Sequence, residues 1–336
     1  MRNWSTRLGR SPKSLAVPCK MNQVLDNPFP YSDSNKRYHT FSYTMKKRYG
    51  KKIAKIPLNA GFTCPNRDGS KSTGGCRFCS STGSGDTILA PTEDLLIQYD
   101  LNWQRAKKKW PDCLGMAYFQ SFSNTYAPLK KLKEIYTPFI ENPEVTSLSI
   151  ATRTDCFTEE MARWIAAQPK EIWLEFGLQT IHDSTARGMN LCHTFEDAKT
   201  AAALCRQYDI PFCLHLINGL PGEDRIMMVE TAKGAASLQP DAIKIHMLHL
   251  LDNSVLGKEF LQSPFELLSL EEYVSIVCDQ LEVLPADIII ERVTGDGLAS
   301  DLIAPLWTMK KTITANEIDK ELLRRNSWQG RLVKSQ

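Results

Sequence analysis

The sequence predicts an α/β fold: a full or partial (β/α) barrel of the TIM type, with parallel strands and a helical extension at the C-terminal end. Two observations carry this prediction. Seven short apolar runs recur along the chain, and helical patterns with recognisable caps lie between them. The runs are continuously apolar rather than alternating, which is typical of parallel strands whose two faces are both covered. Strands that alternate with helices at this spacing predict βαβ units around a parallel sheet.

The predicted strands follow the apolar runs in chain order. They are residues 51–59, 114–122, 146–154, 171–180, 210–218, 241–250 and 287–294. Thr158, Thr194 and Ser269 each begin a helical pattern, because a hydroxyl at the N-cap accepts from the first turn of a helix. Ser269 and Glu272 have the spacing of a capping box, and a further helix is predicted over 91–109. In such barrels the functional residues lie at the C-terminal ends of the strands.

We expect three segments: a disordered basic leader over 1–27, the barrel over 28–300, and a basic helical extension over 301–336. Met21 is an alternative start of the chain. No stretch approaches the roughly 18 apolar residues of a membrane helix, and no apolar core of a secretory signal is present. We therefore expect a cytoplasmic protein with no membrane partner, whose ten cysteines are reduced thiols.

The charge of the chain is unevenly distributed, although the formal net charge is only +3. Residues 1–60 hold thirteen Lys or Arg against two acids, and residues 309–336 hold seven against three. By subtraction from the totals of 41 and 38, the middle holds 21 basic and 33 acidic residues. Basic ends around an acidic centre indicate a polyanionic partner. The alternative interpretation of these basic ends is a disordered basic leader and a helix that is simply exposed to solvent.

Three cysteines directly after the first predicted strand are the strongest chemical signal. Cys64, Cys76 and Cys79 lie within sixteen residues, in a segment rich in Gly, Ser and Asn. Three thiolates are natural ligands of a soft metal or an iron–sulfur cluster. A structural zinc ion would need a fourth ligand, and the nearest candidates, Cys113 and His39, lie in other segments. Three ligands leave one iron of a [4Fe-4S] cluster open for the amino and carboxylate groups of S-adenosylmethionine (SAM).

Motifs at the ends of the other predicted strands make this pattern more specific. They are 119–124 (FQSFSN), 151–155 (ATRTD), 174–180 (LEFGLQT), 215–223 (HLINGLPGE), Lys244, and 291–296 (ERVTGD). With the cysteines they resemble the radical SAM enzymes. The eleven-residue gap between Cys64 and Cys76 is similar to that in the radical subunit of the Elongator complex and its small bacterial relatives. The resemblance covers roughly residues 30–330, and we expect no acetyltransferase domain.

The resemblance implies a [4Fe-4S] cluster on the three cysteines and SAM as the second cofactor. The residues implied as cofactor contacts are Gln120, Ser121, Arg153, Glu175, Gln179, His215, Gly219 and Arg292. Gln120 and Ser121 stand where the family has a Gly-Gly-Glu-like loop for the SAM amine. Lys244 and His193 are the candidate catalytic residues, because a lysine inside a barrel must find a partner or a substrate anion. Arg292 either closes the barrel mouth with Asp296 or simply pairs with it.

The implied contacts of Glu175, Gln179 and Arg153 depend on the local structure. Glu175 and Gln179 are four residues apart, so both reach the barrel mouth only if the strand breaks near Gly177. Arg153 is suited to a bidentate contact with the SAM carboxylate. Its alternative is an ion pair within the protein, with Asp155 or Glu175.

The implied reaction is reductive cleavage of SAM to a 5′-deoxyadenosyl radical, which abstracts a hydrogen from a substrate. The Elongator resemblance and the basic ends favour a tRNA, modified on the side chain of its wobble uridine, with flavodoxin or ferredoxin as electron donor. Basic residues within 36–55 would grip phosphates, and Tyr38, Phe41 and Tyr43 would stack on bases or else pack on the barrel. The alternatives are radical chemistry on a small metabolite or a tetrapyrrole, and a non-catalytic zinc-binding RNA adaptor.

Overall fold

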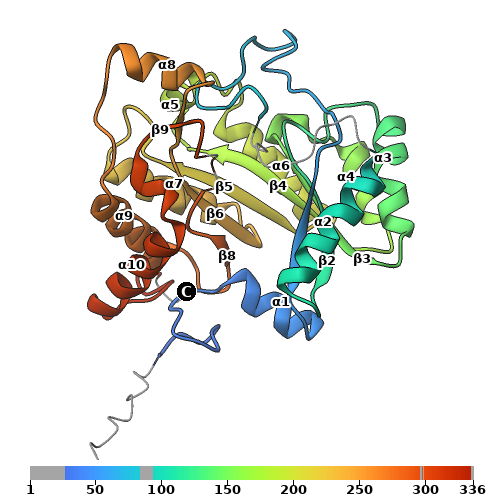
Figure 1. The fold of residues 1–336 in the computed structure, drawn as a ribbon, viewed down its shortest axis with the longest axis horizontal. Coiled ribbons are helices and arrows are strands. Elements are labelled where there is room, and N and C mark those ends of the chain that lie inside the picture. Colours follow the sequence, from blue (N-terminus) through green and yellow to red (C-terminus); the bar gives the residue numbers. More distant parts are fainter. Residues whose placement is uncertain (1–26, 84–93, 296, 298, 334–336) are drawn as a thin grey trace, which may run out of the picture.

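The computed structural model describes residues 27–83, 94–295, 297 and 299–333. The predicted leader therefore lies outside the described residues, except for Asn27. Seven parallel strands form one sheet that curls into a half-barrel (Figure 1). In sheet order they are β1 (Ile53–Leu58), β2 (Leu114–Phe119), β3 (Val145–Thr152), β4 (Ile172–Gln179), β5 (Phe212–Asn218), β6 (Ala242–Met247) and β8 (Ile289–Arg292). All seven predicted strands are present, and the barrel is partial.

Helices connect the strands and cover the outside of the sheet. They are α1 (Phe41–Tyr49), α2 (Leu95–Lys109), α3 (Leu129–Glu141), α4 (Glu159–Ala166), α5 (Asp183–Gly188), α6 (Phe195–Gln207), α7 (Arg225–Ser237), α8 (Val255–Gln262), α9 (Leu270–Val283) and α10 (Lys311–Arg324), with short 3-10 turns η1 (Thr154–Cys156) and η2 (Leu306–Met309). Figure 1 shows α2, α3 and α4 on one flank and α9 and α10 on the other. The predicted capping box is present at Ser269, the N-cap of α9, and Thr194, the predicted start of α6, also forms one.

One predicted strand is divided in two. The run 241–250 leaves the large sheet at Met247, and its last residue begins β7 (Leu250–Leu251), which pairs antiparallel with β9 (Leu302–Ala304). The C-terminal extension is not a separate body, because Ile318 and Leu322 of α10 are fully buried in the main core. None of the described helices is long and apolar enough to cross a membrane.

Side chains that point into the half-barrel form layers, because successive residues of a strand face opposite sides of a sheet. The lowest layer is apolar and closes the bottom of the half-barrel. It consists of Ile53, Met116, Trp173, Cys213, Ala242 and Ile289, packed around Met45 of α1. Two residues further along the strands lies a second layer, which we call the charged layer: Lys55, Tyr118, Ser149, Glu175, His215, Lys244 and Glu291. Each of the seven strands contributes one residue to it.

Candidate active site

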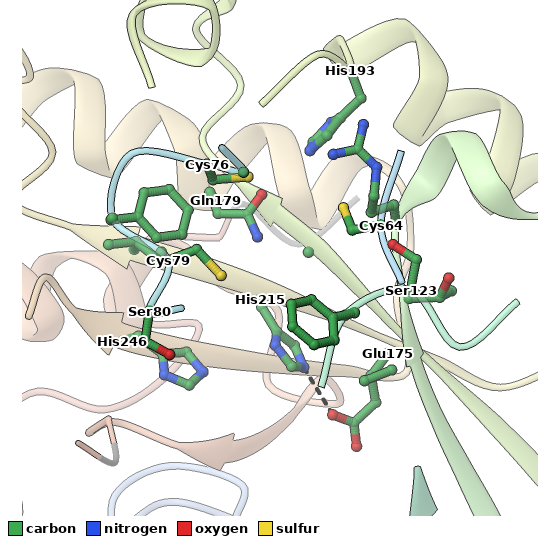
Figure 2. A pocket seen from close by; sticks show the side chains of 18 of the residues that line it. Cys64, Cys76, Cys79, Ser80, Ser123, Glu175, Gln179, His193, His215 and His246 are labelled. Carbon is green, nitrogen blue, oxygen red and sulfur yellow. Dashed lines mark hydrogen bonds and ion pairs between the residues drawn. The ribbon is translucent and has the colours of Figure 1, made fainter. Parts of the chain in front are cut away.

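A cavity of about 250 Å³ opens at the C-terminal ends of the strands, above the charged layer. Figure 2 shows Cys64, Cys76 and Cys79 on one side of it, and His215 and His246 on the side nearer the charged layer. The cysteines belong to the segment after β1, and the histidines belong to β5 and β6. Residues far apart in the sequence therefore meet at the end of the half-barrel where parallel α/β sheets usually bind ligands.

The loop that carries the cysteines is shaped by its own hydrogen bonds. The amide of Gly75 donates to the carbonyl of Asn66 at 2.8 Å, and the guanidinium of Arg67 donates to the carbonyl of Ser81 at 3.1 Å. Gly75 has a φ of 81°, and a Cβ there would lie 2.9 Å from Nε of Arg67. Only glycine fits this turn without strain. The glycines of this segment thus let the backbone fold closely around the thiols.

The same loop is docked onto residues 188–191, which are the last residue of α5 and the three that follow it. Arg77 donates to the first carbonyl of this segment at 2.8 Å, and Asn66 donates to its last carbonyl at 3.0 Å. Asn190 returns a hydrogen bond of 2.8 Å to the carbonyl of Gly75. These contacts hold the loop in place through protein groups alone.

Glu175 is the centre of the charged layer, and its side chain has 0% exposed surface. Its Oε1 accepts from Nζ of Lys55 at 2.5 Å and from the hydroxyl of Ser149 at 2.6 Å. Its Oε2 lies 2.9 Å from Nε2 of His215 and accepts from the ammonium of Lys244. Each carboxylate oxygen thus has two partners within the protein, which uses its acceptor positions fully.

Glu291 is the second carboxylate that contacts Lys55 and Lys244. Its oxygens lie 2.6 and 2.8 Å from Nζ of Lys55, and one of them lies 3.3 Å from Nζ of Lys244. Burial alone would raise the pKa of Glu175, but Lys244 and Lys55 lower that pKa well below its usual range. Burial lowers the pKa of Lys244, and the two carboxylates raise it, with a net rise. Glu175 and Lys244 therefore stay charged, and the layer sets two acidic side chains against two basic ones.

Strand β4 bulges near Gly177, and both Glu175 and Gln179 line the cavity. The pairing of β4 with β5 shifts register between Gly177 and Gln179, and Gln179 has a φ of 62°. With its nitrogen turned toward the chain, the Gln179 amide donates to the carbonyls of Gly177 and Leu178 at 2.9 and 3.1 Å. A Cβ on Gly177 would lie 2.3 Å from the other terminal atom of that amide, which is its oxygen in this orientation. Glycine therefore makes the room in which Gln179 turns to the cavity.

Arg153 lines the cavity but is engaged within the protein. Its Nε and Nη2 donate to the two carboxylate oxygens of Asp155 at 2.8 and 2.7 Å, and its Nη1 donates to the carbonyl of Leu191 at 2.7 Å. Burial raises the pKa of Asp155. Its contacts, led by the one with Arg153, lower that pKa, and the net shift is downward. The alternative considered for Arg153, an ion pair with Asp155, is thus present in the structure.

Two histidines carry buried nitrogens that lack a hydrogen bond from the described part of the chain. They are Nδ1 of His193, a residue with 7% exposed surface, and Nε2 of His246. Burial and the charge of Arg153 lower the pKa of His193 to about 4. Burial and the charge of Arg292 lower the pKa of His246 well below its usual range. Both rings are therefore neutral near neutral pH, and both line the cavity.

Most predicted site residues meet at this cavity. Those that line it are Cys64, Cys76, Cys79, Arg153, Glu175, Gln179, His193 and His215. Lys244 lies beneath it, with 3% exposed surface. Gln120, Ser121, Gly219 and Arg292 are not among the lining residues, and Asp296 lies outside the described residues.

Two of the non-lining residues have a clear reason for their placement. Ser121 and Phe122 have φ values of 73° and 60°. This turn buries Ser121 and brings Phe122 and Ser123 to the cavity in its place. Gly219 lines a second cavity of about 510 Å³, formed with Gly222 and residues of α9.

Sequence reasoning missed the residues that complete the floor of the site: Lys55, Tyr118, Ser149 and Glu291. Only Glu291 stands in a quoted strand-end motif, 291–296, where no role was assigned to it. The signal of Lys55, Tyr118 and Glu291 is their position, because each lies two residues beyond a bottom-layer side chain in its own strand. Strand registers are needed to align those positions, and the sequence alone does not supply registers.

The residues predicted to grip RNA are mostly placed elsewhere. Tyr38 has 5% exposed surface and packs in the main core, so it has no free face for a base. Lys55 belongs to the charged layer. Lys46 and Lys47 are exposed on α1, whose Met45 plugs the bottom of the half-barrel. This end is opposite the cavity, because α1 contacts the first residues of the strands rather than the last.

Comparison with known proteins identifies the family. A model of the Radical SAM superfamily matches residues 64–235, and a model of the Radical_SAM C-terminal domain matches residues 240–324. This chain belongs to the radical SAM superfamily. The uncharacterized protein YtqA of Bacillus subtilis (strain 168) is 43% identical over 308 residues, which are 91% of this chain and 96% of that protein.

Two further matches are more distant. The tRNA uridine(34) acetyltransferase of Methanocaldococcus jannaschii is 24% identical over 154 residues, which are 45% of this chain and 28% of that protein. Among solved structures, archaeal Elp3 of Methanocaldococcus infernus matches with a TM-score of 0.62 at 15% identity. The match covers 82% of this chain and 64% of the Elp3 chain, and it shows a shared fold.

Membership of the radical SAM superfamily implies a [4Fe-4S] cluster and SAM, and the donor set at the cavity fits such a cluster. Cys64, Cys76 and Cys79 supply three thiols to one cavity. Burial and the neighbouring thiol of Cys79 raise the pKa of Cys76 to about 12. A cationic iron centre would offset that cost of forming thiolates. Within the described residues, no group of three His, Cys, Asp or Glu side chains is arranged to hold a single metal ion.

Proposed function

We propose that this protein cleaves SAM reductively to a 5′-deoxyadenosyl radical and uses that radical to modify the wobble uridine of a tRNA. The observation that carries the first half is the three-thiol wall of a cavity at the strand ends, in a chain of the radical SAM superfamily. A [4Fe-4S] cluster held by Cys64, Cys76 and Cys79 would supply the electron for SAM cleavage. The rest of the cavity positions the reactants and limits access of solvent.

Three side chains of this cavity have distinct tasks in the proposal. Gln179, turned inward at the β4 bulge, offers its amide oxygen to a polar group of SAM. His193 offers its unpartnered Nδ1 to a polar group on the same side. Arg153 keeps Asp155 ionised and supplies positive charge near the cysteines, where an anionic carboxylate is favoured.

The tRNA half of the proposal is supported by the match to the tRNA uridine(34) acetyltransferase, a protein named for its action on uridine 34 of tRNA. The excess of Lys and Arg over acids in residues 1–60, thirteen against two, would attract a polyanion. A one-electron donor such as flavodoxin or ferredoxin would reduce the cluster. If phosphates are gripped electrostatically, tRNA binding weakens steeply as salt is added, and binding that is indifferent to salt argues against the grip.

Anaerobic reconstitution with iron and sulfide tests the radical half. We expect a brown protein that binds about four iron atoms per chain and releases 5′-deoxyadenosine from SAM after reduction. A colourless protein with one zinc ion per chain and no SAM cleavage would support the RNA-adaptor alternative instead.

Comparison of modified nucleosides in tRNA from cells with and without the gene tests the substrate half. We expect one wobble-uridine nucleoside to disappear and its precursor to accumulate. An unchanged profile, with SAM cleavage intact, would favour a small metabolite or a tetrapyrrole as substrate.

A further inference from the structure

Of the charged-layer residues that line the cavity, Tyr118, Glu175 and His215, the histidine is the most exposed. The side chains of Glu175 and Lys244 have 0% and 3% exposed surface, whereas that of His215 has 19% and lines the cavity. Figure 2 shows the His215 ring within the cavity, with its bond to Glu175 on the far edge. His215 is therefore where the charged layer and a bound molecule would meet.

The contact with Glu175 fixes which ring nitrogen of His215 holds the proton. Nε2 lies 2.9 Å from Oε2 of Glu175, which is ionised and can only accept hydrogen bonds. Nε2 is therefore the N–H, and Nδ1 of the neutral ring is left as an acceptor. A carboxylate that orients a histidine in this way is a common device for presenting one defined nitrogen to a substrate.

The surroundings keep this state stable. Charged or titratable groups face His215 from three other strands: Glu175 on β4, Lys244 and His246 on β6, and Arg292 on β8. Burial and the ammonium of Lys244 lower the pKa of His215 to about 4, so the ring is neutral near neutral pH. In the described part of the chain, no group donates a hydrogen bond to Nδ1.

We propose that His215 determines substrate specificity, because its Nδ1 accepts a hydrogen bond from an N–H of the molecule that receives the radical. This rests on the proposed function. The base of a uridine carries a single N–H donor, at N3, whereas the same atom of cytidine is an acceptor. A fixed acceptor therefore selects uridine and rejects cytidine by leaving two lone pairs opposed. The charged layer has the task of holding that acceptor in one tautomer.

Nitrogen-15 NMR of histidine-labelled protein tests the tautomer without cofactors or substrate. We expect His215 as the Nε2–H form, neutral down to a pH of about 5, since its pKa is about 4. The Nδ1–H form, or a positively charged ring at neutral pH, would overturn the proposal whatever the protein does with SAM.

Binding of anticodon stem-loop RNAs to the reconstituted protein tests the recognition. One RNA carries uridine at the wobble position, one carries 3-methyluridine, and one carries cytidine. We expect both replacements to weaken binding about tenfold, the cost of one lost hydrogen bond. In His215→Phe, which lacks the acceptor, the three RNAs should bind alike. In His215→Asn, which restores a polar atom near the position of Nδ1, part of the preference for uridine should return.

Controls separate this proposal from the proposed function and from misfolding. His182→Phe removes a histidine outside the cavity and should keep the preference for uridine. Thermal unfolding tests whether His215→Phe is folded. If that variant is unfolded, the NMR measurement of the tautomer in the wild-type protein still tests the proposal. If the protein cleaves SAM and modifies tRNA but His215→Phe keeps full preference, the specificity proposal fails alone. If SAM is not cleaved at all, the proposed function fails and this proposal fails with it.

Discussion

Lys55 on the first strand of the half-barrel and Glu291 on the last are bound to each other, with Nζ–Oε distances of 2.6 and 2.8 Å. They are 236 positions apart in the sequence. Strands β1 and β8 are the two edges of the sheet and do not pair through their backbones. The ion pair therefore bridges the open seam of the half-barrel at the depth of the charged layer. The stability of the fold should depend on this layer remaining balanced.

Replacing Lys55 by methionine should strongly destabilise the protein. The change leaves two buried carboxylates, Glu175 and Glu291, with one ammonium between them. Breaking a buried ion pair in this way typically costs about 3–5 kcal/mol, which urea denaturation can measure. Lys52→Met, at the start of the same segment, should change the free energy of unfolding by less than about 0.5 kcal/mol. Equal stability of the two variants would mean that the layer does not hold the seam.

Replacing any one of Cys64, Cys76 and Cys79 by alanine should abolish the iron content and the visible absorption of the reconstituted protein. Each loss removes one of three thiolates, and a cluster needs all three to keep its place. Cys113→Ala, a buried cysteine before β2, serves as the control and should bind iron like the wild type. Retention of full iron by a triple alanine variant would place the cluster elsewhere.

Stability should fall as the pH is lowered from about 6.5 to about 4. Burial lowers the pKa of His193 and of His215 to about 4 in the folded chain, against about 6.5 when unfolded. In this window the unfolded chain binds protons that the folded chain does not. The free energy of unfolding then drops by up to about 1.4 kcal/mol per pH unit for each histidine. The lowered pKa of Glu175 adds a further loss below the pKa of the unfolded carboxyl.

Urea denaturation across this pH range measures the effect. His215→Phe should lower the slope of stability against pH, because one of the two histidines is gone. A slope that is the same in the variant and the wild type would mean that His215 is protonated as readily in the folded chain as in the unfolded one.

Gly177→Ala should weaken SAM binding to the reconstituted protein about as much as Gln179→Ala does. The new methyl group would lie 2.3 Å from the present position of one end of the Gln179 amide, so that side chain must leave. Equilibrium dialysis with SAM measures both. The double variant should be no worse than either single one, because the two changes remove the same contact. Additive losses would show that Gly177 acts independently of Gln179.

The sequence predicted the order of elements well, because the signals for them are local. The apolar runs, the caps at Thr194 and Ser269, and the glycine-rich cysteine loop each depend on neighbours along the chain. The spacing of Glu175 and Gln179 set a break near Gly177 as the condition for both to reach the cavity, and β4 shifts register there. The charged layer was not predicted, since Lys55 and Glu291 become partners only through strand registers and curvature. The aromatic Tyr38 was open to two interpretations, and burial in the core decided between them.

The docking of the cysteine loop onto residues 188–191 bears on how this protein withstands air. The loop is held by Arg77, Asn66 and Asn190 through hydrogen bonds that involve no sulfur–iron bond. Loss of an oxygen-sensitive cluster would then leave its thiols gathered, at little further conformational cost. Repair requires delivery of iron and sulfide, and no refolding of the chain. In cells that alternate between aerobic and anaerobic growth, folded protein without its cluster could persist through the aerobic phase and be reactivated by a new cluster afterwards.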